Sequence, residues 1–262
     1  MQLKGARAIV TGASSGIGRA IAIEFARRGA RIMLAARRAD LLAELAEQIS
    51  REGGSAAPMP IDVTEAGAPE RLAAETLARF GGVDLLVNNA GIGLHAGVAD
   101  ASAADVEALF RLNVLAAAAM IRAVIPSMRQ QRSGMVINIS SVAGRIVIPR
   151  IGYYSASKFA LTAIGDALRL EEGPQIRVMN VFPGTTRSSF GENRLGIRAR
   201  APHQRMPAVP AEKVARRIAA GVEGNRSSVY ISLVPDRIGV AVNHVAGWAV
   251  ARVLGRWARR AT

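Results

Sequence analysis

Two side chains in the stretch GYYSASKFAL, residues 152–161, could carry out acid–base chemistry. If this stretch is helical, Lys158 lies four residues after Tyr154, so the two side chains share one face of the helix. A phenol has an unperturbed pKa of about 10, and a nearby ammonium favours the phenolate and brings the group closer to proton transfer near neutral pH. Tyr153 has only Ser157 at this spacing. Tyr154 and Lys158 are therefore candidate catalytic residues, although an ordinary amphipathic helix can show the same spacing.

A glycine-rich loop, TGASSGIG at residues 11–18, follows the first apolar run of the chain and leads into a helical pattern. Gly12 permits a tight turn, Gly16 lets a pyrophosphate approach the backbone, and Gly18 lets the helix pack closely on the strand. The N-terminus of the helix supplies oriented N–H groups and a partial positive charge. The loop therefore predicts a dinucleotide site.

The end of the second apolar run, in LAARRADLL, bears on the choice of dinucleotide. In such folds an acidic residue at this place holds a ribose 2′-hydroxyl, whereas an arginine accommodates a 2′-phosphate. Ala36 stands where the acid is expected, and Arg37 and Arg38 follow it. Because a guanidinium binds phosphate through charge-assisted hydrogen bonds, the sequence favours NADP over NAD. The alternative is that both arginines only solvate the start of a helix.

Strand and helix patterns alternate over most of the chain. Alanine-rich helical patterns separate the apolar runs, and glycines end the first three of them, as is typical of helix C-termini. This alternation predicts an α/β fold with a doubly wound parallel sheet, the Rossmann fold, in one catalytic domain over residues 1–235. The seven runs expected to form strands are residues 6–12, 30–37, 56–63, 83–91, 134–141, 176–184 and 227–234.

Composition limits the function classes. The chain has 262 residues, no cysteine and three histidines, so we expect neither a disulfide nor a metal site. Its formal net charge is +14, but the basic residues are spread along the chain and aromatic residues make up only 4% of it, so we expect no nucleic-acid partner. The first residues lack the features of a signal peptide, and a cytoplasmic location is the default expectation.

From the first strand to about Ser189, the order of motifs resembles that of the short-chain dehydrogenases/reductases. The glycine motif stands at residues 11–18, N-N-A-G at residues 88–91, a helix asparagine at Asn113, a serine at Ser141, Y-x-x-x-K at Tyr154 and Lys158, and P-G at residues 183–184. The usual threonine a few residues after P-G appears here as Ser188. Six motifs in this order are far more specific than any one of them.

The resemblance implies a hydride transfer between a nicotinamide and a carbonyl compound or alcohol. Tyr154 would be the acid and base, Lys158 would lower its pKa and hold the nicotinamide ribose, and Ser141 would bind the substrate oxygen. Ser140 is the competing candidate, but the family places its serine just before a VAG-like turn. Asn113 would hold a water that links Lys158 to solvent, a role compatible with stabilising a helix kink.

The resemblance also implies the residues around NADP, with Asp62 and Val63 near the adenine and Asn89 near its ribose. His95 either lines the substrate cleft or is a surface-loop histidine, and the surface reading is favoured. The full set of expected cofactor residues is Gly12, Ser14, Ser15, Gly16, Ile17, Gly18, Arg37, Arg38, Asp62, Val63, Asn89, Ala90, Gly91, Tyr154, Lys158, Pro183, Gly184, Thr186 and Ser188.

Two segments depart from the family core. Residues 191–210 form an irregular stretch that we interpret as a lid over the substrate, with a solvated loop as the alternative. Residues 236–262 form a basic amphipathic extension, and its apolar run, residues 238–251, is too short to span a bilayer. The extension could lie at an anionic membrane surface, cover a neighbouring subunit or close over the substrate.

The expected function is therefore an NADP-dependent reduction of a bulky apolar ketone by a homodimer or homotetramer. Arginines at Arg194, Arg198, Arg200 and Arg205 keep an acidic substrate in play. The alternatives from other classes are a catalytically idle dinucleotide-binding scaffold and a peripheral membrane protein.

Overall fold

A sheet of seven parallel strands, in the order β11-β7-β6-β4-β1-β2-β3, forms the centre of the computed structural model, which describes residues 1–191, 194–196, 208–232 and 240. Each of the seven apolar runs overlaps one of these strands, so the expected α/β fold is confirmed. Every residue of β4 and β6 is buried, as expected for inner strands of a parallel sheet covered on both faces. The strands are β1 (Arg7–Thr11), β2 (Arg31–Ala36), β3 (Ser55–Pro60), β4 (Leu85–Asn88), β6 (Gly134–Ile139), β7 (Ile176–Pro183) and β11 (Ser228–Ile231).

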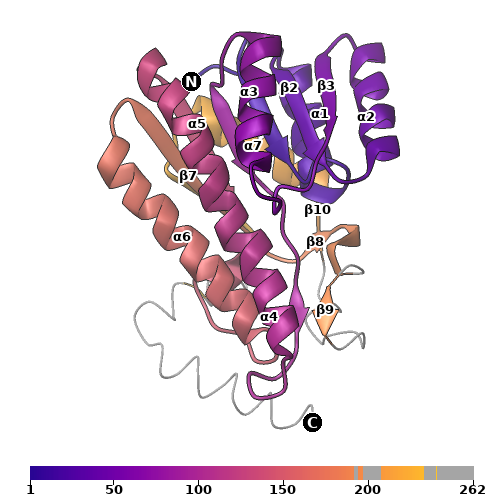
Figure 1. Cartoon of the computed structure of the whole chain (residues 1–262), viewed down its shortest axis with the longest axis vertical. Coiled ribbons are helices and arrows are strands. Elements are labelled where there is room, and N and C mark those ends of the chain that lie inside the picture. The colour runs from indigo at the N-terminus through magenta and orange to yellow at the C-terminus, as the bar shows by residue number, and fades with distance from the viewer. Residues whose placement is uncertain (192–193, 197–207, 233–239, 241–262) are drawn as a thin grey trace.

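Helices cover both faces of the sheet, and Figure 1 shows the resulting layers. One apolar cluster joins one face of the sheet to α1 (Gly16–Arg27), α2 (Ala39–Arg51) and α7 (Ala211–Glu223). A second cluster joins the other face to α3 (Ala68–Phe80), α5 (Ala117–Gln131) and α6 (Gly152–Glu172). Glycines with positive φ follow α1, α2 and α3 at Gly29, Gly53 and Gly81, where the backbone needs a left-handed residue.

A continuous helical run, Ala103–Gln131, crosses the second layer as α4 (Ala103–Phe110), the π-helical turn η1 (Arg111–Ala116) and α5. Among the described residues it is the one helix long and apolar enough to cross a membrane, with a mean hydropathy of 1.8. Half of its apolar window is buried inside the fold, and Met120, Val124 and Met128 pack into the second cluster. The buried half of this run therefore belongs to the core.

The segment expected to be irregular contains short regular elements where the structure describes it. β9 (Leu195–Gly196) pairs with β5 (Leu94–His95), and β10 (Val209–Pro210) pairs with β8 (Thr186–Arg187). Residues 192–193 and 197–207 of the expected lid, and all of the C-terminal extension except residue 240, lie outside the described residues. The pairings of β9 and β10 attach both ends of this segment to loops that follow sheet strands.

A buried asparagine ladder links three neighbouring strands. Asn88 donates to Asn138 at 3.1 Å, Asn138 donates to Asn180 at 3.3 Å, and Asn180 donates to Asp166 of α6 at 2.9 Å. Gly165 lets α6 approach, because a Cβ there would lie 2.3 Å from Oδ1 of Asn180. The ladder fixes the register of β4, β6 and β7 close to their carboxyl ends.

Candidate active site

The expected functional residues gather at one edge of the sheet. Because all seven strands are parallel, their carboxyl ends face the same side, and the motifs begin within a residue or two of the ends of β1, β2, β3, β4, β6 and β7. The strand order reverses between β1 and β4, and ligands of open α/β sheets bind outside such a switch point. The topology therefore brings together residues far apart in the chain, such as Gly16 and Ser188, which are 172 positions apart.

Ser141, Tyr154 and Lys158 form one group beyond β6. α6 places Tyr154 and Lys158 one turn apart, and the Nζ of Lys158 lies 5.8 Å from the centre of the Tyr154 ring. A hydrogen bond links the side chains of Ser141 and Tyr154. The hydroxyl of Tyr153 points elsewhere and donates to the backbone oxygen of Val98 at 3.3 Å. Of the two tyrosines, Tyr154 is thus the one next to both serine and lysine.

Burial shifts the pKa values of Tyr154 and Lys158. Burial raises the pKa of Tyr154 to about 12, and its hydrogen bond with Ser141 offsets only part of that rise. Burial also lowers the pKa of Lys158 to about 8. Loss of hydration is thus the largest influence on the phenol, and the ammonium of Lys158 donates to the backbone oxygen of Ile139 at 2.9 Å. That Lys158 lowers the pKa of Tyr154 stays a prediction.

The two candidate serines occupy different environments. Ser140 is 3% exposed, and its hydroxyl is engaged with the backbone oxygen of Lys158 and with Thr162. Ser141 is less buried, caps the short helix η2 (Val142–Gly144) by accepting from the N–H of Ala143, and reaches Tyr154. The structure thus gives Ser140 a packing role and places Ser141 beside the phenol.

Asn113 lies in the π-helical turn η1 and is 1% exposed. Its amide oxygen accepts from the N–H of Ile92 at 2.8 Å, and its amide nitrogen donates to the oxygen of Ile92 and to the hydroxyl of Ser157. A Cβ on Gly91 would lie 3.0 Å from Oδ1 of Asn113 and 3.5 Å from Nζ of Lys158. Asn113 therefore ties η1 to the segment that follows N-N-A-G and to α6, and the second lone pair of its amide oxygen remains for a water.

Hydrogen bonds to the residues that follow β4 fix the glycine loop. The hydroxyl of Thr11 accepts from the N–H groups of Asn89 and Ala90 at 3.0 Å, and the side chain of Asn89 donates to the backbone oxygens of Thr11 and Gly12. A Cβ on Gly18 would lie 2.4 Å from both Nδ2 of Asn89 and the oxygen of Gly12. Gly18 is thus required for close packing, as expected, and the side chain of Asn89 fixes the loop.

The N-terminus of α1 is open to an anion. Ser15 stands at the N-cap without a side-chain hydrogen bond to the helix, and the first turn has no acidic residue. The first N–H groups of α1 are therefore without a side-chain partner from the cap. Gly16 has φ +56°, and a Cβ there would lie 3.1 Å from Cβ of Ser188, which places the loop after β7 next to this helix. These residues suit the pyrophosphate of a dinucleotide.

Arginines flank the same loop at the end of β2. Arg38 donates to the hydroxyls of Ser14 and Ser15 at 2.9 and 2.8 Å. Arg37 is 77% exposed and lies 3.8 Å from the carboxylate of Asp62. Hydrogen bonds from Thr64, together with the charge of Arg37, hold the pKa of Asp62 below its usual range against the opposing effect of burial. This corner carries the guanidinium groups of Arg37 and Arg38, with the carboxylate of Asp62 beside Arg37.

Other expected residues follow β3 and β7 at the same edge of the sheet. Val63 is buried in the second cluster, Pro183 ends β7, and Thr186 donates to the oxygen of Gly184. His95 is 5% exposed and lies in β5, so its interpretation as a surface-loop histidine is wrong. The pairing of β5 with β9 covers a segment that the sequence alone leaves as a loop.

Sequence reasoning missed Phe190, which lies in η3 (Ser189–Gly191). Its ring centre is 5.9 Å from that of Tyr154. The only signal in the sequence is an aromatic residue shortly after P-G, and nothing in the spacing indicates which way it points.

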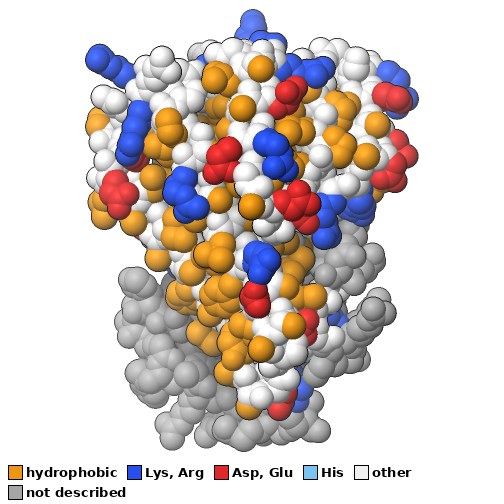
Figure 2. Space-filling view, viewed as in Figure 1, with side chains coloured by type: hydrophobic (Ala, Val, Ile, Leu, Met, Phe, Trp, Pro, Cys, Tyr) orange, Lys and Arg blue, Asp and Glu red, His pale blue; other side chains and the backbone are white. Residues whose placement is uncertain are grey.

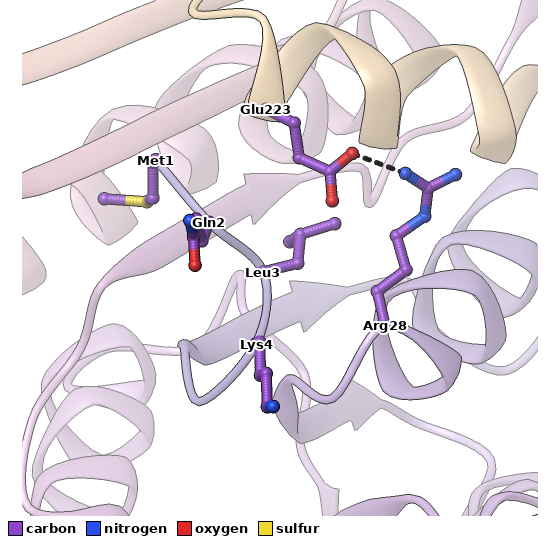
Figure 3. Close-up of a pocket in the computed structure, with 6 residues that line it drawn as sticks. All are labelled: Met1, Gln2, Leu3, Lys4, Arg28 and Glu223. Carbon is purple, nitrogen blue, oxygen red and sulfur yellow. Dashed lines mark hydrogen bonds and ion pairs between the residues drawn. The ribbon is translucent and has the colours of Figure 1, made fainter.

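One further hollow, of about 420 Å³, lies at the opposite edge of the sheet, before the start of β1. Figure 3 shows its lining by the first four residues of the chain together with Arg28 and Glu223, which form an ion pair at 2.6 Å. It is remote from every motif described above.

Comparisons with known proteins identify the family of the chain. The family model for short chain dehydrogenases matches residues 6–195. The dehydrogenase/reductase SDR family protein 7-like of Drosophila melanogaster is 33% identical over 254 residues, which cover 93% of this chain and 78% of that protein. Against the curated relatives that it matches, the chain spans between 15% and 90% of their length.

Two solved structures share the fold and hold a nucleotide. A short-chain dehydrogenase/reductase from Burkholderia phymatum in complex with NAD has a TM-score of 0.84 and 26% identity, over 93% of this chain and 94% of that one. An alcohol dehydrogenase from Thermococcus sibiricus complexed with 5-hydroxy-NADP has a TM-score of 0.76 and 26% identity, over 86% and 94%. Because the family model matches well over half of the chain and the Drosophila relative is 33% identical over 93% of it, this chain belongs to the short-chain dehydrogenases/reductases.

Proposed function

We propose that the chain is an NADP(H)-dependent oxidoreductase that interconverts a carbonyl compound and an alcohol, and that it reduces a bulky apolar ketone. The observation that carries the proposal is the contact of Ser141 with Tyr154, one helical turn from Lys158, at the end of the sheet where the glycine loop lies. A catalytically idle scaffold would gain nothing from a buried lysine near a buried phenol, because burying the lysine ammonium costs stability.

In the proposed reduction, Tyr154 gives its proton to the carbonyl oxygen while the carbonyl carbon gains a hydride. When bound, a reduced nicotinamide supplies that hydride. A tyrosine with a pKa of about 12 is fully protonated at neutral pH, so the acid needed for reduction is ready in the resting chain. Ser141 holds the carbonyl oxygen by a hydrogen bond, and Lys158 stabilises the phenolate that forms. Solvent then returns the lost proton, with Asn113 positioning the segments around Lys158.

The preference for NADP rests on the end of β2. Ala36 supplies no carboxylate there, and Arg37 and Arg38 supply two guanidinium groups, of which Arg38 already lies across Ser14 and Ser15. A phosphate at this corner would gain charge-assisted hydrogen bonds, whereas the carboxylate of Asp62 lies beside Arg37.

Titration with NADPH and NADH tests the cofactor preference. We expect NADPH to bind more tightly, and Arg38→Asp and Arg37→Asp to weaken NADPH by about tenfold or more while changing NADH little. Arg51→Asp, at the far end of α2, is the matched control and leaves both affinities unchanged. Equal affinities in the unmodified chain would contradict the preference.

Screening bulky ketones, steroids and carboxylated carbonyl compounds for NADPH oxidation tests the reaction. Arg194 is the one arginine of the proposed acidic-substrate set within the described residues; Arg198, Arg200 and Arg205 lie outside them. If carboxylated substrates exceed apolar ones by more than about tenfold in kcat/KM, the apolar-substrate proposal must be abandoned.

We further propose a cytoplasmic homodimer or homotetramer. Figure 2 shows hydrophobic side chains gathered over α4 and α5, and Leu115 and Phe159 are 61% and 40% exposed on η1 and α6. Sedimentation velocity tests the assembly, and Leu115→Glu should weaken it.

Co-sedimentation with anionic vesicles, with and without residues 236–262, tests the alternative of peripheral membrane attachment.

A further inference from the structure

Phe190 lies beside the proton-donating group from a part of the chain remote in sequence. Its ring centre is 5.9 Å from that of Tyr154 and tilted by 57°, within the range that aromatic pairs prefer. Phe190 is nevertheless 40% exposed, whereas the core residue Phe182 is 0% exposed. A large apolar ring therefore reaches solvent directly next to the phenol.

The position of Phe190 is supported from two sides. A Cβ on Gly93 would lie 3.3 Å from Cε1 of Phe190, so the absence of a side chain at Gly93 gives the ring its place. The N–H of Phe190 points to the hydroxyl of Ser188 at 3.4 Å, and Ser188 itself lies against Gly16 of the glycine loop. The loop after β7 thus touches the expected cofactor site with Ser188 and the phenol with Phe190.

A buried apolar cluster packs against Tyr154, the partner of the Phe190 ring. Leu94 and Leu109 are 2% and 0% exposed, and Tyr154 and Leu195 pack against them. β9 is held to β5 by the register Leu94 to Leu195, which anchors the chain that follows Phe190. The ring therefore has a firm apolar base and one exposed part.

We propose that Phe190 is a specificity-determining residue, which contacts the substituent on the substrate carbonyl and selects an aryl or similarly flat apolar group. The inference rests on the proposed function, because it places the carbonyl oxygen at Tyr154 and Ser141. A flat group next to that carbonyl can contact the tilted rings of Tyr154 and Phe190 at once, and aromatic pairs gain attraction beyond the burial of apolar area.

Steady-state reduction of acetophenone and butanone with NADPH tests the proposal. In Phe190→Ala we expect kcat/KM for acetophenone to fall about tenfold and kcat/KM for butanone to stay within about twofold. Phe190→Leu, which keeps an apolar side chain, should lose about threefold with acetophenone. Leu170→Ala, 87% exposed at the far end of α6, is the matched control and changes neither value.

Gly93→Ala provides a second variant that leaves Phe190 in the sequence. Its methyl group displaces the Phe190 ring by a few tenths of an ångström, so acetophenone should again lose more than butanone, by about threefold. Equal losses with both ketones in Phe190→Ala would make Phe190 a packing residue and overturn the proposal. A gain with both ketones would make Phe190 a plug over Tyr154 and overturn it as well.

Calorimetric binding of benzamide and acetamide in the presence of NADPH separates this proposal from the proposed function. We expect Phe190→Ala to weaken benzamide about tenfold and to leave acetamide unchanged. Such a result in a chain that reduces no ketone would refute the function and still support the role of Phe190. Ketone reduction that does not depend on Phe190 would refute only that role. If the chain neither reduces ketones nor binds benzamide, both proposals are refuted.

Discussion

Replacing Lys158 by methionine should stabilise the chain at neutral pH while abolishing its activity. Lys158 is 4% exposed, and burial lowers its pKa from 10.5 to about 8. Below pH 8 the lysine is charged in both the folded and the unfolded chain, and the folded chain carries the cost of burying that charge. Between pH 8 and 10.5 the unfolded chain binds more protons, so the free energy of unfolding rises with pH over this window.

A pKa shift of this size corresponds to about 3 kcal/mol of destabilisation at pH 7. Lys158→Met removes that cost, and it also removes the hydrogen bond to the oxygen of Ile139, worth about 1 kcal/mol. The variant should therefore be about 2 kcal/mol more stable than the unmodified chain at pH 7. At pH 10, where most of the lysine is neutral in the folded chain, the difference should shrink to near zero.

Urea unfolding at pH 7 and pH 10, without nucleotide, measures this difference by linear extrapolation. Lys213→Met, at an exposed position of α7, is the control and should show no difference that depends on pH. A Lys158→Met chain less stable than the unmodified one at pH 7 would refute the reasoning. So would a stabilisation of the same size at both pH values, because the lost hydration of the ammonium would then not be its cause.

Three other substitutions test the packing and the acid, and Tyr153→Phe serves as the control for the acid. Gly18→Ala should abolish nucleotide binding and cost about 1–3 kcal/mol, because its methyl group would lie 2.4 Å from the oxygen of Gly12; an unchanged melting temperature would contradict this. Gly165→Ala should cost a similar amount in urea unfolding, because its methyl group would lie 2.3 Å from an amide oxygen of the asparagine ladder. Tyr154→Phe should lower kcat by about a hundredfold or more with nucleotide affinity intact, whereas Tyr153→Phe should be mild; the reverse ranking would show that the wrong tyrosine was chosen.

The order of elements could be predicted from the sequence because it depends on local patterns. Each buried parallel strand is a short apolar run, and each of the first three helices ends near a glycine that the structure places at positive φ. The glycine loop follows its strand directly, so its place at the carboxyl edge follows from connectivity. The spacing of Tyr154 and Lys158 sets them on one helical face without any tertiary information.

Tertiary structure decided what depends on surroundings. The pKa values of Tyr154 and Lys158 follow from how deeply α6 is buried, which no spacing reveals, and the choice between Ser140 and Ser141 depends on which hydroxyl faces Thr162. Likewise, His95 is buried because β9 pairs with its strand from about a hundred residues away. Phe190 meets Tyr154 only through such a distant contact, because loop closure between remote segments is set by the whole fold rather than by neighbours in the chain.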